Sequence, residues 1–235
     1  MADKYQCTAI RSHLVNHIND DWPKDLEAWV ELDIRDALHR ENYYFDEEMD
    51  LVWPGRILPD PAASLRFFKG YGKKDMLRSL PAIIYDLARC KLTENYDEPC
   101  QEDFAVNAAR WYLLDSWDLL VVSRTKELIT KTLFSAIPFG GSTVPNNCSA
   151  TNIDNKTIAA FWDTLREEAV SGGDILRTLD QWIGGGRDVM LGRDLGVCYS
   201  CAGDIYQVLA DLREEVWGIM EESSREYAQR FELTQ

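Results

Sequence analysis

Two cysteines three residues apart, Cys198 and Cys201, stand directly before the last helix that the sequence predicts. Two thiolates at this spacing can bind one zinc ion, and the start of a helix favours the thiolate form. Cys148, in a predicted loop, is the best third ligand, and no fourth ligand is evident. The same pattern also fits reduced cysteines in a turn, or redox chemistry, although a thioredoxin-like motif needs a preceding strand. The cysteine spacing is therefore compatible with a structural zinc site, with reduced cysteines in a turn and with redox chemistry.

The histidines and a glycine-rich segment carry weaker signals. His13 and His17 have the i, i+4 spacing that can hold zinc on one helix face, but the glutamate of a zinc-protease motif does not follow His13. His39 lies far from the cysteines in the sequence. We interpret His13 and His17 as helix-surface residues. The stretch from Gly184 to Arg187 lacks the Lys-Ser/Thr of a phosphate-binding loop, which favours a flexible connector.

Adjacent carboxylates recur at 167–168, 214–215 and 221–222. Neighbouring residues on a helix do not face each other, so these pairs cannot close on one substrate. Residues 204–235 carry eight acidic side chains against three basic ones. This excess fits a solvated helix face or a docking surface for a basic partner. Because no set of residues has the spacing of a catalytic site, the sequence predicts a protein that is not an enzyme.

The composition narrows the class of protein. The 235 residues include 25 Lys and Arg against 40 Asp and Glu, a formal net charge of −15, with 46% hydrophobic residues. Such a charge disfavours nucleic-acid binding, and the hydrophobic content disfavours disorder. No apolar run is long enough to span a membrane, and no signal peptide is recognised. We therefore expect a cytoplasmic or nuclear protein with reduced cysteines and no membrane partner.

Apolar residues recur at three- and four-residue steps over nearly the whole chain, which predicts an all-α fold of about eight helices. The longest helix is expected over 102–137, with a break at Ser116 or Ser123. Pro81 and Asp174 are expected at helix starts, and Asp154 as an N-cap. The other helices are expected over about 2–18, 22–38, 60–71, 81–89, 154–169, 174–183 and 199–219. Six tryptophans are expected in the core: Trp29, Trp111, Trp117, Trp162, Trp182 and Trp217.

Two stretches resemble a known family. Residues 2–23, ADKYQCTAIRSHLVNHINDDWP, resemble the last helices of a BTB/POZ domain from a fungal protein. Residues 58–92 resemble the helical region that follows the BTB domain in mushroom-type (basidiomycete) fungi. The resemblance implies a terminal BTB-like helix pair over 1–40, a linker over 41–58 and a helical C-terminal domain over 59–235. The strand-rich portion of the BTB domain has no counterpart in this sequence.

The resemblance also implies a function. BTB domains mediate dimerisation and, in some members, recruit a cullin ubiquitin ligase, so we expect a non-enzymatic adaptor whose partners are proteins. Without the BTB strands, we expect weakened or lost dimerisation and an uncovered apolar face over residues 5–18. Two alternatives stay open: a small zinc-dependent enzyme built on Cys148, Cys198 and Cys201, and a partner protein in transcription regulation.

Overall fold

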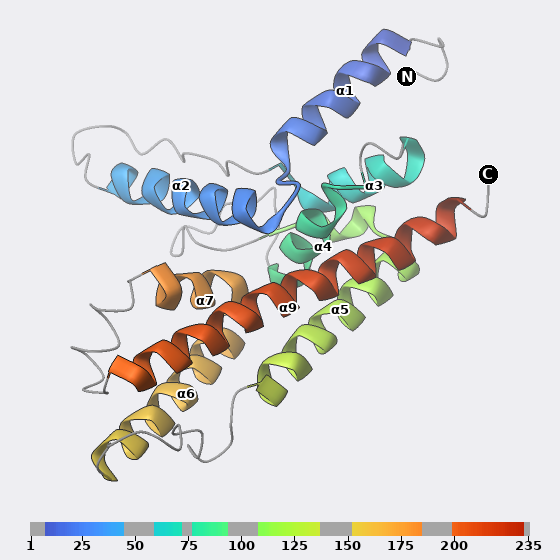
Figure 1. Ribbon diagram of the computed structural model, residues 1–235. Coiled ribbons are helices and arrows are strands. Elements are labelled where there is room, and N and C mark those ends of the chain that lie inside the picture. Colours follow the sequence, from blue (N-terminus) through green and yellow to red (C-terminus); the bar gives the residue numbers. More distant parts are fainter. Residues whose placement is uncertain are drawn as a thin grey trace. The chain divides into compact units, whose positions relative to one another are not determined.

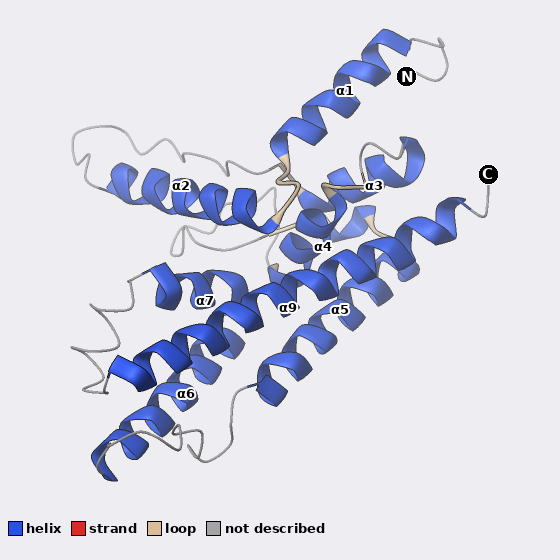
Figure 2. Cartoon of the chain, viewed as in Figure 1, coloured by secondary structure: helices blue, strands red, loops and turns tan. Residues whose placement is uncertain are grey.

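The computed structural model describes residues 8–44, 59–71, 77–93, 108–136, 152–184 and 199–232 of the chain. Within these ranges the chain forms α-helices, one 3-10 turn and no strand, so the predicted all-α fold is confirmed (Figure 1, Figure 2). The elements are α1 (Thr8–Asp21), α2 (Leu26–Tyr44), α3 (Pro61–Tyr71), α4 (Leu80–Arg89), η2 (Trp111–Leu113), α5 (Ser116–Ala136), α6 (Asn152–Gly172), α7 (Ile175–Gly184) and α9 (Tyr199–Glu232).

The chain divides into two compact units, and the division falls inside two helices. One unit contains residues 1–125 and 220–235, and the other contains residues 126–219. Helices α5 and α9 therefore each contribute residues to both units. The division into 1–40, 41–58 and 59–235 rests on the family resemblance and stays a prediction.

Helix α4 lies in the core of the first unit. All ten of its residues are buried, and it packs against α3, in which Leu65 and Phe68 are also buried. Pro81 stands in the first turn, as predicted, where its missing N–H interrupts no bond within the helix. A helix that is apolar on nearly every side is stable only in such a buried position.

A buried cation joins α4 to α2 in the same unit. The guanidinium of Arg89 lies 4.9 Å from the centroid of the Trp29 ring, and its Nε donates to Asp86 at 2.7 Å. A second contact at 3.4 Å reaches Asp33 of α2. The Trp29 ring in turn meets Tyr85 edge-on, with centroids 5.2 Å apart. The carboxylates and the aromatic face replace the water that a buried guanidinium loses.

Aromatic and apolar side chains form the core of the second unit. Trp162 of α6 is buried, and its neighbour Phe161 meets the Trp182 ring of α7 edge-on at 4.8 Å. Arg213 of α9 donates to Asp180 of α7 at 3.2 Å. Further buried residues of this unit are Ile129, Leu133, Ile158, Leu165, Leu176, Leu179, Ile205, Leu209, Leu212 and Val216.

A two-residue turn connects α6 to α7. Gly173 has φ 68°, the left-handed conformation that ends many helices and that glycine adopts without steric cost. The Asp174 carboxylate then accepts a hydrogen bond from the backbone N–H of Arg177 at 3.3 Å, which caps α7 as predicted.

Several helix boundaries differ from prediction. Helix α2 runs over Leu26–Tyr44, whereas the sequence predicts a helix over 22–38 and a linker from 41. The helix predicted over 102–137 begins at Ser116, the first of the two breaks considered, and residues 108–115 are not α-helical. Helix α6 begins at Asn152, so Asp154 lies inside it and is not its N-cap. The last helix continues beyond 219 to Glu232. The extension is explained by apolar residues that stay buried at helical spacing: Met220, Tyr227 and Ala228.

Core placement is confirmed for three of the six tryptophans, and the other three are only partly buried. Trp29, Trp162 and Trp217 are buried, whereas Trp111, Trp117 and Trp182 are partly exposed. Indole combines an apolar body with a polar N–H, so it also suits a boundary with water. The Nε1 of Trp182, for example, donates to the exposed carboxylate of Glu168 at 3.2 Å.

Replacing Gly173 by alanine should lower the free energy of unfolding by about 1 kcal/mol, because an L side chain at φ 68° clashes with its own backbone. The matched control is Gly203→Ala in α9, where an added Cβ meets no atom within 4 Å. The free energy of unfolding of this control variant should be unchanged or higher. Urea unfolding followed by circular dichroism measures both. Equal effects of the two substitutions would contradict the role of Gly173.

Candidate functional site

The predicted zinc ligands fall mostly outside the described part of the chain. Cys148 and Cys198 lie there, and Cys201 is buried in the first turn of α9. Among the described residues, no group of three or more His, Cys, Asp and Glu side chains could hold a metal ion. The zinc site at Cys148, Cys198 and Cys201 therefore stays a prediction.

The other candidate residues of the sequence analysis lie at the surface. His13 and His17 are exposed on α1, and the Nδ1 of His17 lies 2.7 Å from Asp21 Oδ2. That hydrogen bond raises the pKa of His17. All six paired glutamates are exposed: Glu167, Glu168, Glu214, Glu215, Glu221 and Glu222. The solvated-face interpretation fits their positions, and residues 185–197 of the glycine-rich segment lie outside the described ranges.

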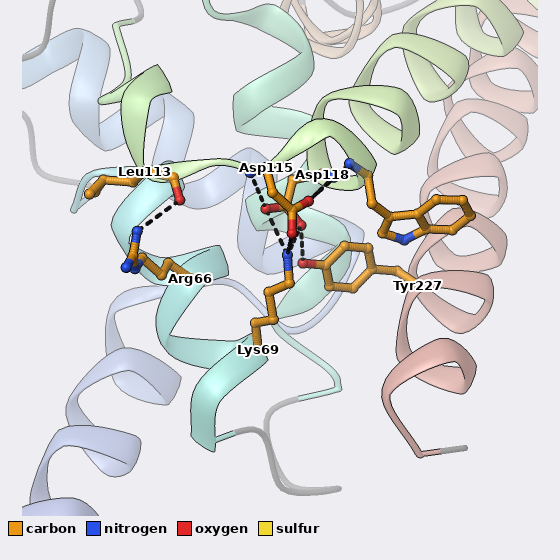
Figure 3. A network of polar contacts seen from close by, with 7 residues as sticks. Arg66, Lys69, Leu113, Asp115, Asp118 and Tyr227 are labelled. Atoms are coloured by element: carbon orange, nitrogen blue, oxygen red, sulfur yellow. Dashed lines mark hydrogen bonds and ion pairs between the residues drawn. The ribbon is translucent and has the colours of Figure 1, made fainter. Parts of the chain in front are cut away.

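A polar cluster that we did not predict from the sequence lies at the start of α5 (Figure 3). The Oδ1 of Asp115 accepts hydrogen bonds from the backbone N–H groups of Trp117 at 2.9 Å and Asp118 at 3.0 Å. In return, Asp118 Oδ2 accepts one from the Asp115 N–H at 2.8 Å. This reciprocal pattern is a capping box with aspartate at both positions. The spacing Asp-x-x-Asp before an apolar run is the sequence signal that predicts it.

Two residues distant in the sequence complete this cluster (Figure 3). Lys69 of α3 donates to both carboxylate oxygens of Asp118, at 2.9 and 3.0 Å, and also to Asp115. The hydroxyl of Tyr227, from α9, donates to Asp118 Oδ1 at 2.7 Å. The side chain of Asp118 is 2% exposed and that of Lys69 is 23% exposed. We call Lys69, Asp115, Asp118 and Tyr227 the Asp118 cluster.

The contacts of the cluster change the pKa values of Asp115, Lys69 and Tyr227. The hydrogen bond from Lys69 lowers the pKa of Asp115 to about 2. Burial alone would lower the pKa of Lys69, but hydrogen bonds to Asp115 and Asp118 outweigh it and raise the pKa. Burial and the hydrogen bond to Asp118 raise the pKa of Tyr227. Fixed protonation at neutral pH suits a structural tie between α3, α5 and α9 better than proton transfer.

Helix α1 leaves apolar side chains uncovered. Ile10 is 52% exposed and Leu14, one turn later, is 41% exposed. Of the α1 side chains that the structure describes, only Val15 is buried. Residues four apart lie on the same side of a helix, so Ile10 and Leu14 present one small apolar surface. We call Ile10 and Leu14 the α1 surface.

Comparisons with known proteins give no family for this chain. A scan against protein-family models finds no match, and neither the curated proteins nor the solved structures contain one. No helix in the described ranges combines the length and the apolar character needed to cross a membrane. Function therefore has to be inferred from the chain's own residues.

Replacing Lys69 by methionine should lower the free energy of unfolding by roughly 3 kcal/mol, because the buried Asp118 carboxylate loses its compensating charge. The control is Arg124→Met, which removes an ion pair with Glu226 in which both side chains are exposed, and should cost less than about 1 kcal/mol. Urea unfolding of both variants provides the comparison. Similar losses for the two would show that the Asp118 cluster stabilises no more than a surface pair.

Proposed function

We propose that this protein is a non-enzymatic protein–protein interaction module, and that the α1 surface is one of its contacts. The observation that carries the proposal is the exposure of Ile10 and Leu14 on a helix that buries a single described side chain. Aliphatic side chains that remain about half exposed lose their contact with water when a partner packs on them.

The resemblance to the end of a BTB domain supports the same function. In that family, helices corresponding to residues 1–40 belong to a domain that binds a second copy or a cullin. An uncovered apolar side over residues 5–18 is what the resemblance implies, and Ile10 and Leu14 fall within that segment. A second copy of the chain and a cullin are therefore the two partners to test first.

The direct test is sedimentation velocity of the wild-type chain over a range of concentrations, alone and with a purified cullin. We expect a concentration-dependent dimer or a complex with the cullin. Replacing both residues of the α1 surface by glutamate (Ile10→Glu with Leu14→Glu) should weaken that association about tenfold or more, because two charges would have to be buried. The control is Leu92→Glu, which changes a leucine that is 73% exposed and lies outside α1.

Two outcomes would contradict the proposal. A wild-type chain that stays monomeric and does not bind the cullin lacks both proposed contacts. An association that the Leu92→Glu change weakens as much as the α1 changes does not use the α1 surface. Circular dichroism of each variant shows that its helices are intact.

A further inference from the structure

A groove of about 600 Å³ opens in the first unit, and its lining residues in the described ranges do not include the members of the Asp118 cluster. Three segments line it: the residues before α2, the residues that begin α4, and the last turns of α9. The lining residues are Lys24, Asp25, Leu77, Arg78, Pro81, Glu221, Ser224, Arg225, Ala228 and Gln229. We call this the basic groove because of its three cations.

The cations of the basic groove are available to a ligand. Lys24, Arg78 and Arg225 are exposed, and none of them forms an ion pair with any residue in the described ranges. The Nε of Arg225 donates to the backbone oxygen of Glu221 at 3.4 Å. This contact leaves the two terminal nitrogens of the guanidinium for a bound anion.

The basic side chains stand out against the rest of the chain. Acidic residues outnumber basic ones by 40 to 25 in the whole sequence, but three basic residues meet two acidic ones in the groove. One of those acids, Asp25, is engaged locally, because its Oδ1 accepts from the Ala28 N–H at 2.9 Å and caps α2. The groove is thus a local reversal of the overall charge, which attracts an anionic group.

The floor of the groove is uncharged. Pro81 and Ala228 are buried there, and the Ser224 hydroxyl already donates to the Met220 backbone oxygen at 2.6 Å. Helix α4 begins at this floor, and its N-cap residue Ser79 makes no side-chain capping bond. The positive end of the α4 dipole therefore adds to the field of the three cations. Among the lining residues in the described ranges, none is aromatic, so none can stack on a nucleotide base.

We infer that the basic groove binds a short acidic peptide of a partner protein, with carboxylate or phosphate groups placed against Arg78 and Arg225. Arginine forks pair with these groups through two parallel hydrogen bonds, and Lys24 adds a third positive charge. A volume of about 600 Å³ holds a few residues of an extended peptide. The inference rests on the proposed interaction function but uses a surface separate from Ile10 and Leu14.

Fluorescence polarisation with three labelled peptides tests the inference on the full chain. The peptides share a Gly and Glu background and differ at one central residue, which is phosphoserine, glutamate or serine. We expect the phosphoserine and glutamate peptides to bind and the affinity to fall with added salt. Arg78→Ala combined with Arg225→Ala should weaken binding about tenfold or more. The matched control, Arg35→Ala, removes an exposed arginine of α2 outside the groove and should leave binding unchanged.

The order of the three peptides identifies the anion. Tighter binding of the phosphoserine peptide assigns a phosphate-binding groove, and equal binding of the phosphoserine and glutamate peptides assigns a carboxylate-binding one. The inference is overturned if none of the peptides binds at concentrations up to about 1 mM. It is also overturned if Arg35→Ala weakens binding as much as the combined Arg78→Ala and Arg225→Ala changes do. Binding to phosphatidylserine vesicles in place of the peptides would assign the groove to a membrane surface and also overturn it. None of these outcomes depends on the α1 surface, so the two proposals can fail separately.

Discussion

The buried carboxylate of Asp118 is the constraint on which the first unit depends. A carboxylate that is 2% exposed has lost its water, so its charge must be compensated by the protein. Lys69 supplies the charge and Tyr227 and the Asp115 N–H supply hydrogen bonds, all within 3.0 Å. These groups come from α3, the start of α5 and the end of α9. One carboxylate thereby holds its own segment to two partners that lie 49 and 109 residues away along the chain.

The hydrogen bond between Tyr227 and Asp118 also bears on the basic groove, because Tyr227 lies in the part of α9 that lines the groove. Tyr227 is followed directly by Ala228 and Gln229, which line the groove, and Arg225 stands two residues before it. The hydroxyl of Tyr227 therefore holds the helix turn that presents Arg225. The Asp118 cluster is then a positioning element, and the groove and the α1 surface are the parts of the first unit that we propose as contacts with other molecules.

The sequence predicts the helices better than the contacts between them. Apolar periodicity finds α3 and α4 to within a residue, because buried apolar stripes and prolines at helix starts are local features. The prediction that the last helix ends at 219 is wrong. Glu221 and Glu222 suggest a solvated helix end, whereas Met220 and Tyr227 remain buried in the helix. The capping box at Asp115 is readable in the sequence, but its link to Lys69 and Tyr227 requires the tertiary fold. The groove is likewise unpredictable, since Lys24, Arg78 and Arg225 are far apart in the chain.

Hydrogen–deuterium exchange of the Tyr227→Phe variant tests the central claim most directly, because it removes one hydroxyl and keeps the ring. The account predicts faster exchange of backbone amides over residues 220–232, with residues 199–219 of the same helix unchanged. The loss of a hydrogen bond to a charged group, about 1.5 to 3 kcal/mol, is large enough to detect in this way. Unchanged exchange over 220–232 would contradict the account, since the end of α9 would then be held without Asp118.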